Sequence, residues 1–358
     1  MLAYITKKIS YAILVLWGVL TLVFFLFNIL PGDPARMMLD KREDANQLAV
    51  IKQKYAFDRS VGEQYALYLN DVLPLSIHHN STTAFTSLMS GKYQYSELFS
   101  IADYTLVFKV PYLRESFVRK GTPVTSILGN TFKNTFVLAI SSIGIALFLG
   151  LILGVFSALY KDTLIDKFIL FVSVLGMSLP SFFASIIIAW LFGFVLHNYT
   201  GLNMTGSLYE VDDYGRGSFL QIKNLILPAI TLGIRPLSVI IQLCRNSLLE
   251  VLSMDYVRTA TAKGLSKFTV IFKHALYNAL NPVVTAVSGW FASLLAGAVF
   301  VEYIFAWNGI GKEIVDALNK MDLPVVMGSV LFIASIFVII NIIVDLIYGW
   351  LDPRIRIS

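Results

Sequence analysis

The chain has 358 residues, of which 56% are hydrophobic and only 14% are charged, and its formal net charge is +5. Because soluble domains carry about a quarter of charged residues, this composition excludes an ordinary soluble protein and indicates one that lies in a lipid bilayer. In a membrane protein a small positive charge reflects orientation, so no nucleic-acid partner is expected. The single cysteine, Cys244, excludes an intrachain disulfide and paired-cysteine metal or redox motifs.

The first apolar run covers residues 9–30 and follows Lys7 and Lys8, as in a signal sequence. It is long enough to cross a bilayer, and it continues into "PGDPARMM" instead of a small-residue cleavage site. Residues 1–30 are therefore predicted to form a cytoplasmic N-terminus and an uncleaved first transmembrane helix.

Residues 31–132 form a long, mixed segment that is predicted to be a large extracytoplasmic region. Its first half contains "SVGEQYALYLNDVL", where Ser60 and Glu63 have the spacing of a helix capping box. The second half is polar and aromatic with weak periodicity, and residues 74–110 are interpreted as a small ordered excursion. This excursion could contact a substrate-binding protein, or it could be a lineage-specific addition without such a role.

Residues 133–350 are predicted to hold five further transmembrane helices. The apolar segments lie at about 133–158, 168–196, 225–248, 279–301 and 325–350. Each has about 20 or more residues, enough for a hydrocarbon core of about 30 Å. The sequence thus predicts an all-α protein with six transmembrane helices.

Lysine and arginine positions orient these helices. Basic residues occur in the 159–167 connection, in the 249–278 loop and in the tail at 351–358. With six spans, all three lie on the side of Lys7 and Lys8, as the positive-inside rule requires. Both termini are therefore expected to be cytoplasmic.

The 249–278 loop has the pattern of two short helices around a glycine. Ser253 is predicted to cap the first helix, Asp255 suits its positive end, Gly264 ends it, and Ser266 caps the second. The apolar face expected on the second helix consists of Phe268, Ile271, Phe272, Ala275 and Ala279. A basic, amphipathic helix pair either lies on anionic lipid or docks into another protein, and the pattern alone leaves both open.

The sequence of this loop resembles the cytoplasmic coupling loop of ABC importer membrane subunits, specifically the dipeptide/oligopeptide permease family, which also includes nickel importers. The resemblance extends over most of the chain except about residues 74–110. It rests on "LPGDPA", "LPAITLG", "SLLEVL", "YVRTATAKGLSKFTVIFKHALYNALNP", "VVTAV", "LLAGAVFVEYIF", "DLPVVMGSVL" and "VDLIYGWLDPRIR". Seven such motifs besides the loop, in the right order, are specific, whereas any one alone would be weak.

The resemblance implies a type I ABC importer permease in the bacterial inner membrane. It implies a homologous second permease subunit, two cytoplasmic ABC ATPase subunits and an extracytoplasmic substrate-binding protein. The residues it assigns to the ATPase-coupling loop are Asp255, Tyr256, Arg258, Thr259, Ala260, Ala262, Lys263, Gly264 and Leu265. Two departures stand out: Arg258-Thr259-Ala260 replaces the general Glu-Ala-Ala pattern, and Asn308 replaces a proline common in the family.

The chain lacks the motifs that would supply its own energy or chemistry. It has no G-x-x-x-x-G-K-[ST] phosphate-binding loop, so ATP and magnesium are expected on partner subunits. No protease motif or carboxylate pair lies inside a span. A transporter subunit that is not an enzyme is expected, with an ATP-independent channel as the contrasting hypothesis.

Three residues inside predicted spans are candidates to line a pathway: Arg235, Pro180 and Ser178. A charge within a span is costly unless paired, so Arg235 is a candidate for a substrate carboxylate, for a structural ion pair or for snorkelling to the interface. Gly150 and Gly154 form a G-x-x-x-G pattern that favours close helix packing.

Peptides are the cargo that the resemblance favours; nickel, glutathione and other small solutes are the alternatives. His78 and His79 are adjacent without a patterned third ligand, which is more typical of surface residues than of a metal site.

Overall fold

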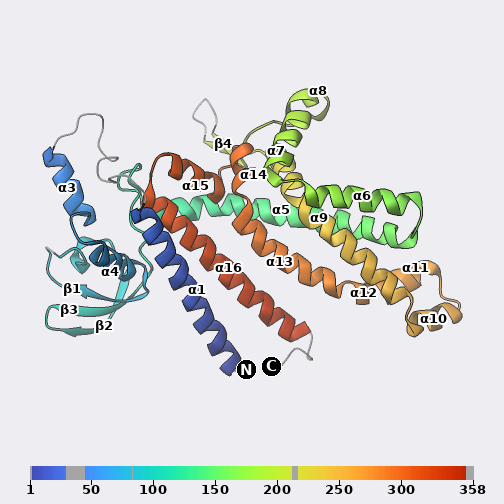
Figure 1. Cartoon of the computed structure of the whole chain (residues 1–358), viewed down its shortest axis with the longest axis horizontal. Helices are drawn as coiled ribbons and strands as arrows, with labels where there is room; N and C mark the ends of the chain where they lie inside the picture. Colours follow the sequence, from blue (N-terminus) through green and yellow to red (C-terminus); the bar gives the residue numbers. More distant parts are fainter. Residues whose placement is uncertain (1, 30–44, 83, 212–216, 352–358) are drawn as a thin grey trace. The chain divides into compact units, whose positions relative to one another are not determined.

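A computed structural model describes residues 2–29, 45–82, 84–211 and 217–351 of the chain (Figure 1). The motif "LPGDPA" and nearly all of the 351–358 tail lie outside these residues. The chain divides into two compact units, one made of residues 1–130 and 314–335, and the other of residues 131–313 and 336–358.

The first unit combines helices with a small sheet. Its elements are α1 (Leu2–Ile29), α3 (Ala45–Tyr55), α4 (Val61–Val72), β1 (Leu75–His79), a 3-10 turn (Leu88–Ser90), β2 (Tyr95–Ile101) and β3 (Tyr104–Lys109). The predicted capping box at the start of α4 is confirmed, because Glu63 N–H donates to Ser60 Oγ and Ser60 N–H donates to the Glu63 carboxylate.

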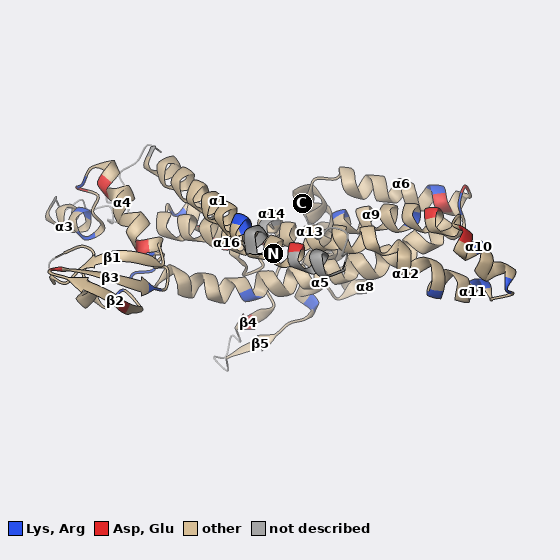
Figure 2. Ribbon diagram, turned by 90° about the horizontal axis from the view of Figure 1, so that it is seen from below, with Lys and Arg blue, Asp and Glu red and all other residues tan. Residues whose placement is uncertain are grey.

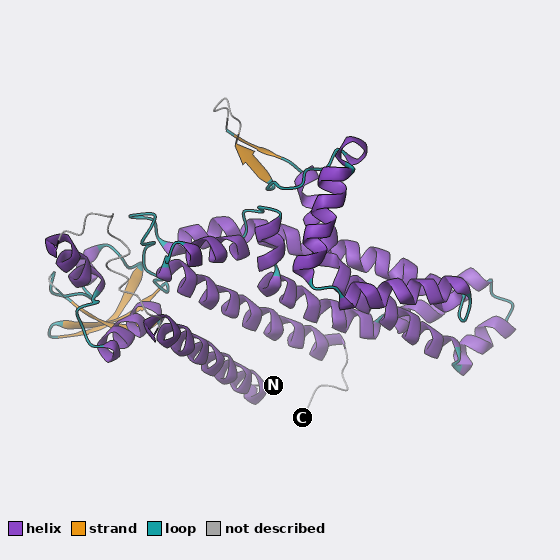
Figure 3. Cartoon of the chain, turned by 45° about the horizontal axis from the view of Figure 1, so that its top comes forward, coloured by secondary structure: helices purple, strands orange, loops and turns teal. Residues whose placement is uncertain are grey.

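The three strands form an antiparallel sheet in the order β1-β3-β2. Strands are drawn in orange in Figure 3, and these three were not predicted from the sequence. The burial pattern of β1 is the reverse of the usual one, since Ser76 and His78 are buried while Leu75 and Ile77 are exposed. Register pairs Leu75 with Phe108 and thereby extends the exposed apolar face. Strand β2 is exposed at every position and its sequence does not alternate between apolar and polar residues, so it gives no strand signal.

The remaining helices include the candidate membrane spans. They are α5 (Val124–Leu159), α6 (Leu164–Ser178), α7 (Ser181–Trp190) with a π-helical turn (Leu191–Val195), α8 (His197–Thr200), α9 (Lys223–Leu252), α10 (Asp255–Ala262), α11 (Lys267–Thr269) with a second π-helical turn (Val270–Ala275), α12 (Leu276–Ala279), α13 (Asn281–Gly297), α14 (Val299–Ile304), α15 (Ile310–Asn319) and α16 (Leu323–Leu351). A short hairpin joins β4 (Tyr209–Val211) to β5 (Ser218–Leu220).

Four described helices are long and apolar enough to cross a membrane: Thr6–Asn28, Val124–Leu159, Lys223–Leu252 and Leu323–Asp345. The predicted third span is a pair of helices, α6 and α7, that bend by 109° next to Pro180. The predicted span at 279–301 is divided between α13 and α14. The chain is therefore a mostly helical, multi-pass membrane protein.

Helix α9 is central to the packing of the second unit. Its Ile240 and Cys244 lie so close to Gly150 and Gly154 that a Cβ on either glycine would approach them to 2.6 and 2.7 Å. The predicted close packing at the G-x-x-x-G pattern is thus confirmed, and its partner is α9 of the same chain. Gly176 of α6 makes a similar approach to Ser238, so α9 touches helices on two sides.

Candidate functional site

The basic loop begins immediately after α9. Helix α10 starts at Asp255 with Met254 as its N-cap residue, and no side chain caps it. The predicted cap at Ser253 is wrong, because its backbone is still helical and its hydroxyl donates back to Glu250 O at 2.7 Å. A hydroxyl that bonds the preceding turn is not available to the next helix.

The turn between the two helices is as predicted. Gly264 has a φ of 78°, a left-handed conformation that favours glycine because no Cβ is present. Ser266 then caps α11, with its Oγ accepting from Thr269 N–H at 3.3 Å. These two residues fix where the first helix ends and the second begins.

The second helix differs from the expected one in its apolar face. Ile271, Ala275 and Ala279 are buried, but Phe268 and Phe272 are exposed. The cause is the π-helical turn at Val270–Ala275, which changes the angle between successive side chains from that of an α-helix. A face derived from 3.6-residue periodicity is therefore wrong at both phenylalanines.

The residues assigned to coupling are almost all on the surface. Those that are exposed are Asp255, Tyr256, Arg258, Thr259, Ala262, Lys263, Gly264 and Leu265. Ala260 differs, because only 7% of it is exposed and it packs with Val257 toward Val270 and Ile271. Helix α10 thus has an inner face fixed to the fold and an outer face that is available to a partner.

Two hydrogen-bonded contacts hold the helix pair together. Asn278 Nδ2 donates to Tyr256 Oη at 2.8 Å, and Tyr256 Oη donates to His274 O at 3.4 Å. The ion pair between Arg258 and Asp255 is long, at 3.6 Å, and lies at the surface; such pairs contribute little. Tyr256 therefore has a structural role besides its place on the outer face.

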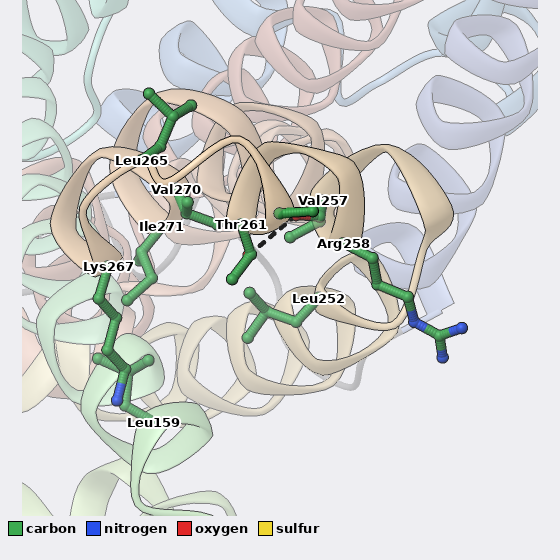
Figure 4. Close-up of a pocket in the computed structure, with 10 residues that line it drawn as sticks. Leu159, Leu252, Val257, Arg258, Thr261, Leu265, Lys267, Val270 and Ile271 are labelled. Carbon is green, nitrogen blue, oxygen red and sulfur yellow. Dashed lines mark hydrogen bonds between the residues drawn. The ribbon is translucent and has the colours of Figure 1, made fainter.

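An apolar groove of about 780 Å³ runs between the loop and the ends of two long helices (Figure 4). Leu159 is the last residue of α5 and Leu252 the last residue of α9, and both line the groove together with Leu265 and Lys267. Figure 4 shows that Arg258 extends away from the other lining side chains. Figure 2 shows lysine and arginine residues around α10 and α11.

A buried ion pair close to the loop was not found by sequence reasoning. Arg245 of α9 donates from Nε and Nη2 to the two carboxylate oxygens of Asp166, both at 2.7 Å. Asp166 also accepts from Ser157 Oγ and from Asp162 N–H. The sequence places these residues far apart, so only the fold shows that α6, α9 and the end of α5 meet at one carboxylate.

A second buried carboxylate explains the segment "VEYIFAWNGIG". Glu302 is fully buried and accepts from Thr135 Oγ1 and Gly311 N–H, each at 2.7 Å. Gly311 lies in the first turn of α15, where backbone N–H groups lack helical partners. A Cβ at Gly309 would clash with the Glu302 carboxyl group, so a side chain here would displace that carboxylate.

Asn308 lies in the same segment, where the resemblance leads one to expect proline. Its N–H donates to Ser207 Oγ at 3.2 Å, and its carbonyl accepts from Asn134 Nδ2 at 2.8 Å. Proline has no N–H and could not make the first bond. The departure thus has a local explanation and leaves the Glu302 contact intact.

The three candidate pathway residues lie on α9 and at the bend between α6 and α7. Arg235 is exposed on α9 and has no ion pair with any residue that the structure describes. Pro180 is the N-cap residue of α7 at the 109° bend, and Ser178 Oγ donates to Val174 O of its own helix.

Comparison with known proteins identifies the class of the chain. Residues 150–357 match the family described as the inner membrane component of binding-protein-dependent transport systems, and residues 1–86 match the N-terminal family of the same components. The chain belongs to this family, whose members are the membrane permeases of ABC importers. It is therefore a transport permease subunit and not an enzyme.

Named relatives cover essentially its whole length. The chain is 34% identical to the di/tripeptide transport system permease protein DppB of Pseudomonas aeruginosa, over 99% of both chains. It is 32% identical to the dipeptide transport system permease protein DppB of Alkalihalophilus pseudofirmus, over 99% of this chain and 100% of that one. It is 31% identical to the glutathione transport system permease protein GsiC of Salmonella paratyphi A, over 99% of both.

Among solved structures, the chain resembles an inward-facing structure of the MetNI methionine ABC transporter. The TM-score is 0.50 at 16% identity, covering 64% of this chain and 98% of that one. At this identity the likeness concerns the fold alone, and it agrees with the family assignment.

Proposed function

We propose that this chain forms half of the translocation pathway of a bacterial importer that carries dipeptides or oligopeptides across the inner membrane. In this arrangement six segments cross the bilayer and both termini are cytoplasmic. The bent pair α6–α7 and the pair α13–α14 supply the two crossings that are not single straight helices. The positive-inside rule supports this orientation, because α10, α11 and the turn between them carry Arg258, Lys263 and Lys267.

A homologous second permease would complete the pathway, and two cytoplasmic ATPase subunits would bind and hydrolyse ATP with magnesium. An extracytoplasmic binding protein would deliver the substrate. The names of the relatives in the dipeptide and di/tripeptide systems favour peptides as cargo. Glutathione is itself a small peptide, and the relative named for its transport favours it as the second candidate.

The observation that carries the coupling proposal is the two-sided character of α10. Its inner residues Val257 and Ala260 are buried, whereas Arg258 and the turn at Gly264 are exposed. Only two residues separate α10 from the end of α9. A docked ATPase would thus act on a short helix that continues almost directly into a membrane helix, and discrete rigid elements of this kind transmit movement.

Affinity purification from the host in mild detergent tests this proposal. We expect P-loop ATPases to co-purify with the tagged chain and to be lost when Gly264→Pro is combined with Arg258→Glu. Arg258→Glu alone should reduce ATPase recovery by about tenfold, since reversing a charge at an interface opposes a complementary surface. The matched control is Lys273→Glu, the same charge reversal at an exposed residue outside 258–265.

If no ATPase is recovered even after cross-linking in native membranes, and uptake does not depend on ATP, the loop is a membrane-surface helix pair and the chain is closer to a channel. Cargo is tested separately by uptake of labelled dipeptides and of glutathione in cells with and without the gene. Competition of uptake by dipeptides but not by glutathione would support the first cargo over the second.

A further inference from the structure

A pocket of about 300 Å³ lies within the unit that contains α1 and the three-stranded sheet. Its apolar wall includes Phe24 and Phe27 of α1 and Met327 of α16. Its polar wall includes Lys52 of α3 and Arg114 of the segment that precedes α5. This volume is in the range of small-molecule sites, and the two walls differ in chemistry.

The pocket lies where two apolar helices end. Asn28, the last residue of the membrane-compatible part of α1, and Leu323, the first residue of α16, both line it. Only 17% of the most apolar window of α1 is buried within the chain, compared with 61% for α9. Most of the α1 surface is therefore left for lipid to cover. The end of a helix that spans a bilayer is where hydrocarbon is expected to meet the lipid headgroups.

The guanidinium of Arg114 has hydrogen-bond donors left for a further partner. Arg114 uses its Nε to donate to Asp71 Oδ2 at 2.9 Å, and Asp71 also accepts from Tyr93 Oη at 2.8 Å. Among the residues that the structure describes, the two terminal nitrogens of Arg114 have no hydrogen bond. Because a guanidinium recognises planar oxyanions through such paired donors, one edge of Arg114 is fixed and the other edge is available.

The surroundings of Arg114 hold it in place. Its guanidinium lies 5.3 Å from the ring centre of Tyr68 and 5.8 Å from that of Phe85. Arg59 and Lys92 also lie over Phe85, at 5.9 and 5.1 Å. The backbone of Arg114 is left-handed, with a φ of 64°, a conformation that costs energy for a residue with a Cβ. Several cations thus gather around one aromatic ring, which makes this region attractive to an anion.

From this arrangement we propose that the pocket binds an anionic phospholipid, with the headgroup phosphate on Arg114 and Lys52 and an acyl chain along the apolar wall formed by α1 and α16. A soluble anion would use the cations but not the phenylalanines. A neutral lipid would use the phenylalanines but gain little from a doubly cationic wall. Only an anionic amphiphile matches both walls and the depth of the pocket.

Native mass spectrometry of the full-length tagged chain, purified with whatever subunits accompany it and then delipidated in detergent, tests this proposal. Phosphatidylglycerol is the probe, phosphatidylcholine of the same acyl composition is the neutral comparison, and glycerol 3-phosphate is the soluble anion. We expect phosphatidylglycerol to bind about tenfold more tightly than either. The choline cation of phosphatidylcholine is repelled by the two basic side chains, and glycerol 3-phosphate has no acyl chain to cover the apolar wall.

Lys52→Gln should reduce phosphatidylglycerol binding by about tenfold. Lys54→Gln is the matched control, because Lys54 is an exposed residue of the same helix that does not line the pocket. Arg114→Gln should have the larger effect. Arg114→Gln also breaks the contact with Asp71 and could prevent folding. In that case Lys52→Gln and the apolar-wall variant Phe27→Ser still test the proposal.

The proposal fails if phosphatidylglycerol and phosphatidylcholine bind equally, if glycerol 3-phosphate competes as well as the lipid, or if Lys52→Gln behaves like Lys54→Gln. Equal loss of binding from Phe27→Ser and Lys52→Gln supports a site that needs both walls. The outcome is independent of the ATPase experiment above, because none of these residues lies near the basic loop in the sequence.

Discussion

Arg245 of α9 donates two hydrogen bonds of 2.7 Å to the carboxylate of Asp166 in α6. The side chain of Asp166 is only 3% exposed and that of Arg245 is 14% exposed, so water cannot replace either partner. Such bidentate pairs depend on the shape of the guanidinium as well as on its charge. The pair therefore fixes the angle between two helices near the basic loop.

Arg245→Gln should lower stability by about 3–5 kcal/mol, because it leaves a buried carboxylate without its cation. Arg245→Lys should recover only part of this loss, since a lysine cannot make both bonds. Thermal unfolding of the detergent-purified chain measures the effect. Arg258→Lys, at an exposed ion pair, is the control and should leave the midpoint unchanged; an unchanged midpoint for Arg245→Gln would contradict the assigned role.

Gly154→Ala should destabilise the chain by about 1–3 kcal/mol through overpacking against α9. The added Cβ would lie 2.7 Å from Cys244 Cβ and 3.0 Å from Ile241 O, and the backbone oxygen cannot move independently. Gly144→Ala, in the same helix with nothing within 4 Å of a Cβ, should be neutral or slightly stabilising. Equal melting midpoints for the two variants would show that the helices separate easily here.

Glu302→Gln should loosen the start of α15. The glutamine side-chain amide has only one oxygen acceptor, so it cannot accept from both Thr135 Oγ1 and Gly311 N–H as the two carboxylate oxygens do. A buried group left unsatisfied in this way costs about 1–3 kcal/mol. Hydrogen–deuterium exchange of peptides that cover 308–320 should become faster. Glu250→Gln, at an exposed residue of α9, should leave this exchange as it is in the unmodified chain.

The sheet should lose stability in acid because of His78. This residue is fully buried, with Nδ1 bonded to Thr86 O at 2.9 Å and Nε2 to Ser76 Oγ at 3.0 Å. Burial lowers the pKa of His78 below its usual 6.5, and nearby Lys109 adds to this effect, whereas Asp71 opposes it. The unfolded chain therefore binds a proton more readily, so stability falls as the pH drops below about 6.5.

Hydrogen–deuterium exchange in β1 and β3, corrected for the intrinsic exchange rate, should show less protection at pH 5.5 than at pH 7.5. His78→Gln should reduce this difference. Lys109 also makes stability increase with pH, but in a higher range. Burial lowers the pKa of Lys109 from 10.5 to about 8, so stability rises as the pH increases from about 8 to 10.5. Protection that is constant from pH 5.5 to 7.5 would contradict a buried neutral His78.

Much of this architecture could be predicted from the sequence because long apolar runs, the Ser60–Glu63 box and the glycine at 264 are local signals. The exceptions have identifiable physical causes. The π-helical turn after Thr269 displaced the expected apolar face, and β2 has no alternation of apolar and polar residues that would indicate a strand. Contacts such as Arg245 with Asp166 require the fold, since 79 positions separate the two residues.

The glycines along α5 and α6 have a mechanical consequence. Gly150, Gly154 and Gly176 have no side chain of their own at these contacts, so the backbones of α5 and α6 lie directly against side chains of α9. The carboxylate of Asp166 ties the same helices near their ends. At these three points only the side chain from α9 lies between the two helices. A displacement of α10 would therefore be transmitted to α9 with little loss. Helices α5 and α6 would then move together with α9 as one rigid body.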